Sequence, residues 1–180
     1  MNFFYLCEVM ETMDKKILRN EAARSAVLFG AVSGAYIILS MVLDARAVLY
    51  ILDLAKLVGL IMLMKHCMQS LQNRYEGVDT RSLRRYGTLI ALYSAIITAA
   101  AAYVSYQHLF PDAVKAMWDE IYMQMGSSLD ANTRAGLQWT EANFAPVVTI
   151  SQFIWCLLYG WILSSILAPR VSPSDPFKQQ

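Results

Sequence analysis

Residues 26–43 read AVLFGAVSGAYIILSMVL and contain no charged side chain. A helix that crosses a membrane needs roughly 20 mainly apolar residues, because the hydrocarbon core of a bilayer is about 30 Å thick. This stretch, together with the small residues just before it, meets that requirement. We therefore predict a first transmembrane helix over residues 22–43.

Three further runs of similar character follow it along the chain. They predict spans over residues 47–68, 86–106 and 146–168. Helix is expected for each span, because lipid offers no partner to a free backbone group and no alternating barrel pattern is visible. The sequence thus predicts an all-α, integral membrane bundle of four transmembrane helices. The second span is expected to be the weakest by hydropathy, since it contains charged side chains.

The composition agrees with a membrane protein. Hydrophobic residues make up 57% of the chain and charged residues 16%. Soluble domains are typically about 45–50% apolar and about 25% charged. No nucleic-acid partner is expected, because binding phosphates requires a basic surface and the net charge of this chain is only +1.

The chain is expected to form one membrane domain with short flanks. Residues 22–168 make up the four-helix domain, residues 1–21 a cytoplasmic or interfacial extension, and residues 169–180 a cytoplasmic tail. The start does not resemble a secretory signal, because acidic residues closely follow a short apolar stretch. Met1 and Met13 are both compatible with this interpretation as start sites.

The distribution of basic residues predicts the orientation. Eleven Lys and Arg fall on the side of the termini, and three fall on the other side. The eleven are Lys15, Lys16, Arg19, Arg24, Lys65, Arg74, Arg81, Arg84, Arg85, Arg170 and Lys178, and the three are Arg46, Lys115 and Arg134. Loops rich in Lys and Arg stay in the cytoplasm. Both termini are therefore expected in the cytoplasm, with the chain in the bacterial inner membrane.

The segment between the third and fourth spans is expected outside the cytoplasm and structured. Its apolar residues recur with the spacing of one helical stripe: Val114, Met117, Trp118, Ile121, Tyr122 and Met125. A second, shorter helix is expected from about Ser127 to Asn143. The first helix is expected to lie on the outer membrane surface and cover its own bundle. A docking surface for a partner protein is the second interpretation.

Small residues recur at four-residue spacing in three of the spans. The main candidates for helix packing are Ala26, Gly30, Gly34, Ala95, Ala99, Gly160 and Ser164. Small side chains let helix backbones approach closely, which is how helices associate inside lipid. These stripes predict a compact bundle. Contacts within one chain and contacts between two copies are both compatible with them.

Asp53 and Lys56 are the residues that most invite a chemical role. They lie three positions apart in the second span, so they share a helix face and can form an ion pair. Ionisable residues inside a membrane usually face a bundle interior or a wet cavity. One hypothesis is a self-neutralised structural pair, and the other is a polar pocket for an ion, a proton or a lipid head group.

No other pattern points to chemistry. The sequence has no nucleophile–base pair, phosphate-binding loop or zinc-protease motif, so neither a catalytic residue nor a cofactor is expected. His66 beside Cys67 does not predict a metal site, because neighbouring helix positions face different sides and no second ligand pair is present. The predicted outer segment contains no cysteine, so no disulfide framework is expected there.

Three stretches resemble a known family. They are EAARSAVLFGAVSGAYIIL from residue 21, YEGVDTRSLRRYGTLIALYSAII from residue 75 and YVSYQHLFPDAVKAMWDEIYMQM from residue 103. In these features the chain resembles the bacterial membrane family catalogued as domain of unknown function 4199. The resemblance covers most of the chain from about Met13. It implies a four-helix inner-membrane protein, and it brings no established activity or catalytic residues.

Two classes of function follow from the sequence. The favoured one is a non-enzymatic structural or accessory subunit that assembles with another membrane or envelope component. The alternative is a small transporter or lipid-handling protein that uses a polar pocket near Asp53 and Lys56. Expected partners are membrane lipid and either a membrane protein or a second copy of the chain.

The predicted orientation can be tested by labelling. Single cysteines are placed at Asn132 and at Ser174 in a chain from which Cys7, Cys67 and Cys156 have been removed. An impermeant thiol reagent applied to intact cells is expected to label the cysteine at Asn132 and spare the one at Ser174. The reverse pattern would contradict the orientation.

Overall fold

The protein is described by a computed structural model that covers residues 3–43, 46–75, 78–125 and 130–171. Within these ranges, side chains are described from Lys15 onward, with the exception of Arg46. Within these ranges every regular element is a helix. In chain order they are α1 (Phe3–Val42), α2 (Arg46–Arg74), α3 (Thr80–Val104), the π-helical turn η1 (Ser105–Leu109), α4 (Pro111–Met125), α5 (Ala131–Ala142) and α6 (Phe144–Val171).

Four of the described helices are long and apolar enough to cross a membrane, as the sequence predicts. Their apolar segments are Lys15–Val42, Ala47–Arg74, Thr80–Leu109 and Phe144–Val171, which are 28 to 30 residues long. The second segment contains the most hydrophobic stretch of the four, so the prediction that it is the weakest by hydropathy is wrong: its charged side chains are outweighed by the leucines, isoleucines and valines around them. The four segments exceed the predicted spans because polar residues end the hydrophobic stretch without ending the helix. The largest difference is in α1, which begins at Phe3, so the polar lead-in and the first span form one continuous helix.

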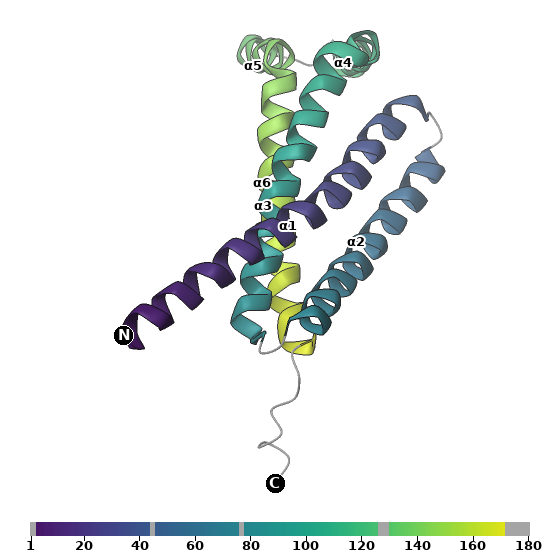
Figure 1. Cartoon of the computed structure of the whole chain (residues 1–180). Helices are drawn as coiled ribbons and strands as arrows, with labels where there is room; N and C mark the ends of the chain where they lie inside the picture. Colours follow the sequence, from purple (N-terminus) through teal and green to yellow (C-terminus); the bar gives the residue numbers. More distant parts are fainter. Residues whose placement is uncertain (1–2, 44–45, 76–77, 126–129, 172–180) are drawn as a thin grey trace.

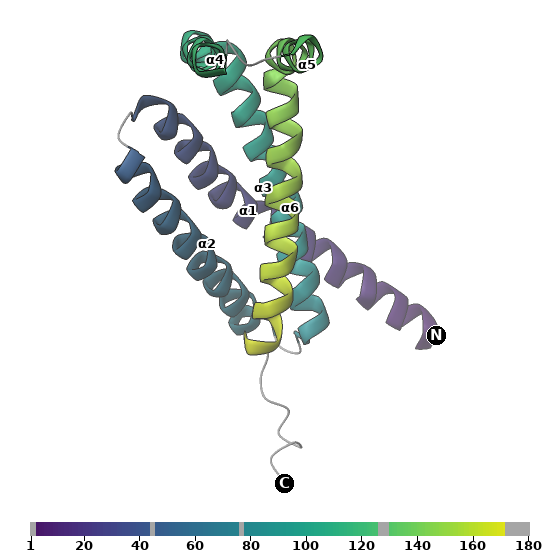
Figure 2. The ribbon, with the colours of Figure 1, turned by 180° about the vertical axis from the view of Figure 1, so that it is seen from behind.

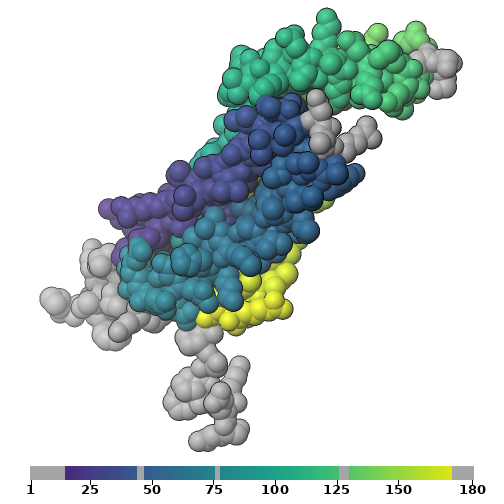
Figure 3. Space-filling model, turned by 90° about the vertical axis from the view of Figure 1, so that its right-hand side faces the viewer, coloured from purple at the N-terminus to yellow at the C-terminus, as the bar shows by residue number. Residues whose placement is uncertain are grey.

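The four long helices run up and down between two ends of the molecule. The start of α1 and the end of α6 lie at one end, which we call the terminal end, while α4 and α5 lie at the other, which we call the α4–α5 end (Figure 1). Helix α6 runs alongside α3 in both views (Figures 1 and 2). Helix α1 crosses α3 obliquely (Figure 1), and α2 lies beside α1 (Figure 3).

Helix α3 is the centre of the bundle because small residues let its neighbours approach closely. A Cβ atom on Gly30 of α1 would lie 2.6 Å from Ile97 Cγ2, and one on Gly34 would lie 3.2 Å from Ala101 Cβ. A Cβ atom on Gly160 of α6 would lie 3.2 Å from Ala91 Cα. The small-residue stripes therefore pack within this chain, and the remaining candidates are also buried: Ala26, Ala95, Ala99 and Ser164.

Helix α2 is attached through only one of its halves. Its buried residues all lie in the half nearer the terminal end: Met64, Cys67, Met68 and Leu71. Among residues 47–60 none is buried. The half of α2 near the α4–α5 end therefore lies against its neighbours without entering the core.

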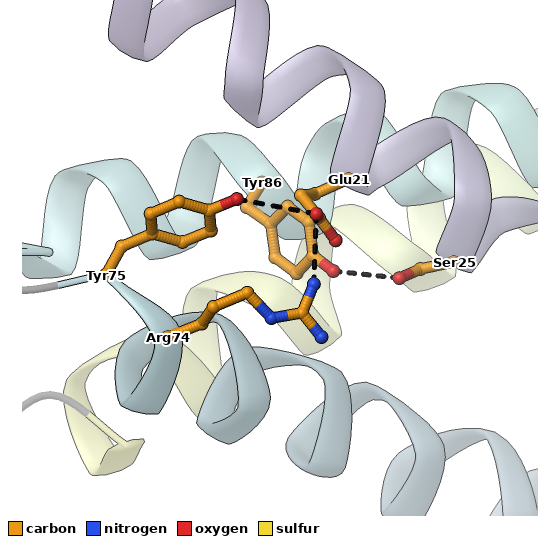
Figure 4. Close-up of polar contacts among 5 residues, drawn as sticks. All are labelled: Glu21, Ser25, Arg74, Tyr75 and Tyr86. Atoms are coloured by element: carbon orange, nitrogen blue, oxygen red, sulfur yellow. Dashed lines mark hydrogen bonds and ion pairs between the residues drawn. The ribbon is translucent and has the colours of Figure 1, made fainter.

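Polar contacts fix the terminal end of α2 (Figure 4). Arg74 forms an ion pair with Glu21 of α1, with 3.0 Å between Arg74 Nη1 and Glu21 Oε1. The Tyr75 hydroxyl donates to the same carboxylate at 3.5 Å. Beside this pair, the hydroxyls of Ser25 and Tyr86 share a hydrogen bond of 2.8 Å that joins α1 to α3.

The α4–α5 segment lies across one end of the bundle (Figure 3). Of the predicted apolar stripe, Trp118 is buried, Val114, Ile121 and Tyr122 are half-buried, and Met117 and Met125 are exposed. Trp118 packs edge-on against Phe144, with ring centroids 5.9 Å apart. The stripe therefore anchors α4 mainly through one side chain.

Helix α5 (Ala131–Ala142) is the second outer helix that the sequence predicts. Helix α5 begins at Ala131, where Asp130 caps it by accepting a hydrogen bond from the Thr133 backbone N–H at 2.8 Å. The predicted start at Ser127 lies outside the described residues. The Tyr122 hydroxyl donates to Glu141 at 2.8 Å and so joins α4 to α5. This hydrogen bond to a carboxylate raises the pKa of Tyr122 above its usual value.

The glycine contacts predict how two substitutions will differ. Gly160→Ala is expected to destabilise the protein by about 1–3 kcal/mol, because its methyl group would meet the α3 backbone at Ala91. Gly59→Ala is the matched control, since a Cβ there meets nothing within 4 Å. Thermal unfolding in detergent is expected to show a lower midpoint for the first variant only. Equal midpoints would show that the close α3–α6 contact is absent.

Candidate functional site

A cavity of about 490 Å³ opens between α1, α2 and α6 in the half of the bundle near the α4–α5 end. It occupies the space left where α2 does not enter the core. Its walls are Ser33, Tyr36, Ile37, Asp53, Leu54, Lys56, Leu57, Leu60, Thr98, Gln152, Trp155, Cys156 and Tyr159. The cavity thus combines both predicted charged residues with side chains from all four long helices.

Asp53 and Lys56 form an ion pair on the wall of this cavity. Lys56 Nζ lies 3.7 Å from Asp53 Oδ1 and also 3.7 Å from the centroid of the Tyr36 ring on α1. An ammonium group over an aromatic face is attracted by the ring electrons. The Tyr36 hydroxyl interacts in turn with the Asp53 carboxylate. Three residues from two helices therefore form one polar cluster.

The ion pair is not sealed by the surrounding chain. The Asp53 side chain is 54% exposed and the Lys56 side chain 30% exposed. Both lie well inside an apolar span, since Asp53 is about 9 Å from the start of that span at about 1.5 Å per residue. Charges at such depth usually face one another, a cavity or water. Asp53 and Lys56 face one another and also line the cavity, and neither side chain is fully buried. Their polar atoms can therefore still bind a ligand.

Two hydroxyl groups add unused hydrogen-bonding capacity to the same cavity. The oxygens of Thr98 and Tyr159 are buried, and neither makes a well-formed hydrogen bond. The Thr98 hydroxyl interacts with the Cys156 thiol, but a thiol is only a weak donor and acceptor. Buried polar atoms are normally satisfied. Both side chains line the cavity, so a side-chain rotation would bring either hydroxyl to a polar group that enters it.

Apart from Ser33 and Gln152, the remaining cavity wall is mainly apolar. Leu54, Leu57 and Leu60 of α2 line the cavity together with Trp155 of α6, which is 70% exposed. Sites for small molecules commonly combine apolar walls with a few placed polar groups. The cavity therefore suits an amphiphilic molecule, with its polar part at Asp53, Lys56 and the hydroxyls.

The other predicted residues lie away from this cavity. The small residues of α1, α3 and α6 form the helix contacts described above, and the α4 stripe lies on the outer segment. His66 is exposed and Cys67 is buried. In the parts of the chain that the structure describes, no group of three or more His, Cys, Asp or Glu side chains is placed to hold a metal ion.

Sequence reasoning identified Asp53 and Lys56 but missed the other polar residues of the cavity, although a signal for them exists. Tyr36, Asp53, Thr98 and Gln152 each lie six to eight residues from the same predicted end of their spans. At about 1.5 Å per residue this places them at a similar depth of about 9–12 Å. Polar side chains at one depth in four neighbouring helices are the pattern that would have pointed to this cavity.

A scan of known family models found no match to this chain, and neither did searches among curated proteins and solved structures. The resemblance noted in the sequence therefore stays a prediction.

The ion pair predicts a non-additive response to substitution. Asp53→Asn alone is expected to destabilise the protein by about 1–2 kcal/mol, since it leaves Lys56 without its counter-charge in a partly dry site. Combining it with Lys56→Met is expected to recover much of that loss, because apolar replacement of a whole pair is often tolerated. Thermal unfolding of the single and double variants in detergent measures this. Losses that simply add would show that the two charges act independently.

Proposed function

We propose that this chain is a non-enzymatic, lipid-handling protein of the bacterial inner membrane. In this proposal both termini lie in the cytoplasm, and the cavity between α1, α2 and α6 holds the polar part of an amphiphilic molecule. The observation that carries the proposal is the half-open Asp53–Lys56 ion pair inside an apolar span. The family resemblance agrees with the location and adds nothing about activity.

The energetics of the ion pair favour a ligand. A charged side chain in the hydrocarbon layer costs several kcal/mol unless it is paired and solvated. Here each charge has one counter-charge and an interaction with Tyr36, and the Asp53 side chain is still 54% exposed on the wall of the cavity. A molecule that carries both hydrogen-bond donors and acceptors would satisfy Asp53, Lys56 and the Thr98 hydroxyl together. Its apolar part would lie along the leucines of α2.

The way in which α2 is attached supports entry of the amphiphilic molecule into the cavity from the side, directly from the bilayer. Because its buried residues all lie beyond residue 60, the other half of α2 can move without exposing the core. The Arg74–Glu21 ion pair meanwhile keeps the terminal end of the helix in place. An amphiphile would then pass directly between the bilayer and the cavity, with its polar group leading.

A second candidate is the accessory subunit expected from the sequence. Its support is the α4–α5 segment, where Met123 is 79% exposed and Trp139 is 62% exposed. Large apolar side chains exposed on both α4 and α5 are available for contact with another protein. In this alternative the segment binds another membrane or envelope protein, and the cavity has no ligand.

Filling the cavity tests the lipid-handling proposal. Leu57 lines the cavity and is 41% exposed, whereas the neighbouring Val58 is 42% exposed and does not line it. Leu57→Trp is therefore expected to lose one of the lipid molecules that co-purify with the parent protein, because the larger ring occupies the cavity. Val58→Trp is the matched control and is expected to retain the lipid. Native mass spectrometry of the full chain extracted from native membranes measures both.

The two candidates give different outcomes in this experiment. Equal lipid retention by both variants, each with an unchanged melting temperature, would contradict the lipid-handling proposal. A protein that co-purifies with both variants and is lost after Trp139→Ser would instead support the accessory-subunit alternative.

A further inference from the structure

A second polar site lies at the terminal end of the bundle, away from the Asp53–Lys56 cavity. A groove of about 530 Å³ runs between α1 and α3. Lys15 and Arg19 line it from α1, and Arg84, Arg85 and Thr88 line it from α3. Its apolar floor consists of Leu18 and Leu89. No acidic side chain is among these residues.

The backbone that presents the α3 arginines is fixed by two hydrogen bonds. The Arg84 carbonyl accepts from the Ser164 hydroxyl of α6 at 2.8 Å and from the Thr88 hydroxyl at 2.9 Å. On α1, Lys15 and Arg19 lie four positions apart and so share one helix face. The basic groups are therefore brought together by rigid helices rather than by loops.

Three of these cations have no counter-charge in the described part of the chain. Where ion pairs are described, Arg74 is paired with Glu21 and Lys56 with Asp53, and neither involves Arg19, Arg84 or Arg85. Like charges gathered around one groove repel one another. An anion that enters the groove would remove that repulsion and gain charge-assisted hydrogen bonds from the guanidinium groups.

The kind of anion follows from two features of the groove: its apolar leucines, and its position at the border of an apolar span. Arg84 and Arg85 lie in the first turns of α3, directly before the apolar stretch that begins at Tyr86. Planar guanidinium groups match the geometry of a phosphate. Leu18 and Leu89 beside them offer a surface for hydrocarbon. Basic pockets between membrane helices at this level bind acidic lipid head groups.

We infer that this groove binds the phosphodiester head group of an anionic phospholipid, with the start of an acyl chain against the two leucines. In the proposed orientation the lipid belongs to the cytoplasmic leaflet. The inference does not depend on the lipid-handling role of the Asp53–Lys56 cavity, since the two sites share no residue. It gives the chain a fixed lipid contact at the terminal end of α1 and α3.

The test measures binding of phosphatidylglycerol to the purified full chain by native mass spectrometry. Arg84→Gln combined with Arg85→Gln is expected to weaken binding about 10- to 30-fold, because each basic group near the membrane surface contributes about fivefold. Arg19→Gln, on the other helix, is expected to weaken it about fivefold. All of these side chains are exposed, so the melting temperature without lipid is expected to be unchanged.

The matched control removes two exposed cations at the same end that do not line the groove, Arg81 and Arg170. Their double change to Gln is expected to leave binding within twofold of the parent. Equal losses in the groove and control variants would overturn the inference in favour of general surface charge. Equal binding of phosphatidylcholine, or displacement of the lipid by millimolar inorganic phosphate, would overturn it in favour of an unselective or a free-anion site.

Discussion

The close approach of α3 to α1 and α6 is the contact on which the other features depend. It requires glycine at residues 30 and 160, because Ile97 and Ala91 occupy the space that a Cβ atom would take. In the most apolar stretch of α3, 44% of the residues are buried, against 6% in that of α2. Three helices thus form a tight core, and α2 attaches to it from outside.

This arrangement explains why a polar cavity lies inside an apolar bundle. Helix α2 reaches the core only through residues such as Met64 and Met68, and its other half leaves a space beside α6. Polar side chains that a fully packed bundle would not tolerate can face this space. An ion pair there needs less protein around it, because a ligand or water can complete its solvation. The loose half of α2 and the charges of Asp53 and Lys56 are therefore parts of one feature.

Much of the fold could be predicted from the sequence, because long apolar runs and small-residue spacing are local signals. They identified the four spans and the faces of α1, α3 and α6 that pack. They did not identify the partners, since the pattern at Gly30 and Gly34 is the same whether Ile97 of this chain or a second copy lies opposite. Of the site, Asp53 and Lys56 were predicted and Tyr36 was not, because the contact of Tyr36 with Lys56 depends on how α1 and α2 lie together. No local pattern encodes that arrangement.

The central claim is that the space between α1, α2 and α6 holds the polar part of an amphiphilic molecule. A crystal structure of the full chain grown from a lipidic mesophase tests it most directly. The account predicts ligand density in the cavity, with polar atoms within hydrogen-bonding distance of Lys56 Nζ and of the Thr98 hydroxyl. A structure in which α2 closes onto α6 and seals the Asp53–Lys56 pair, with no ligand between the helices, would contradict it.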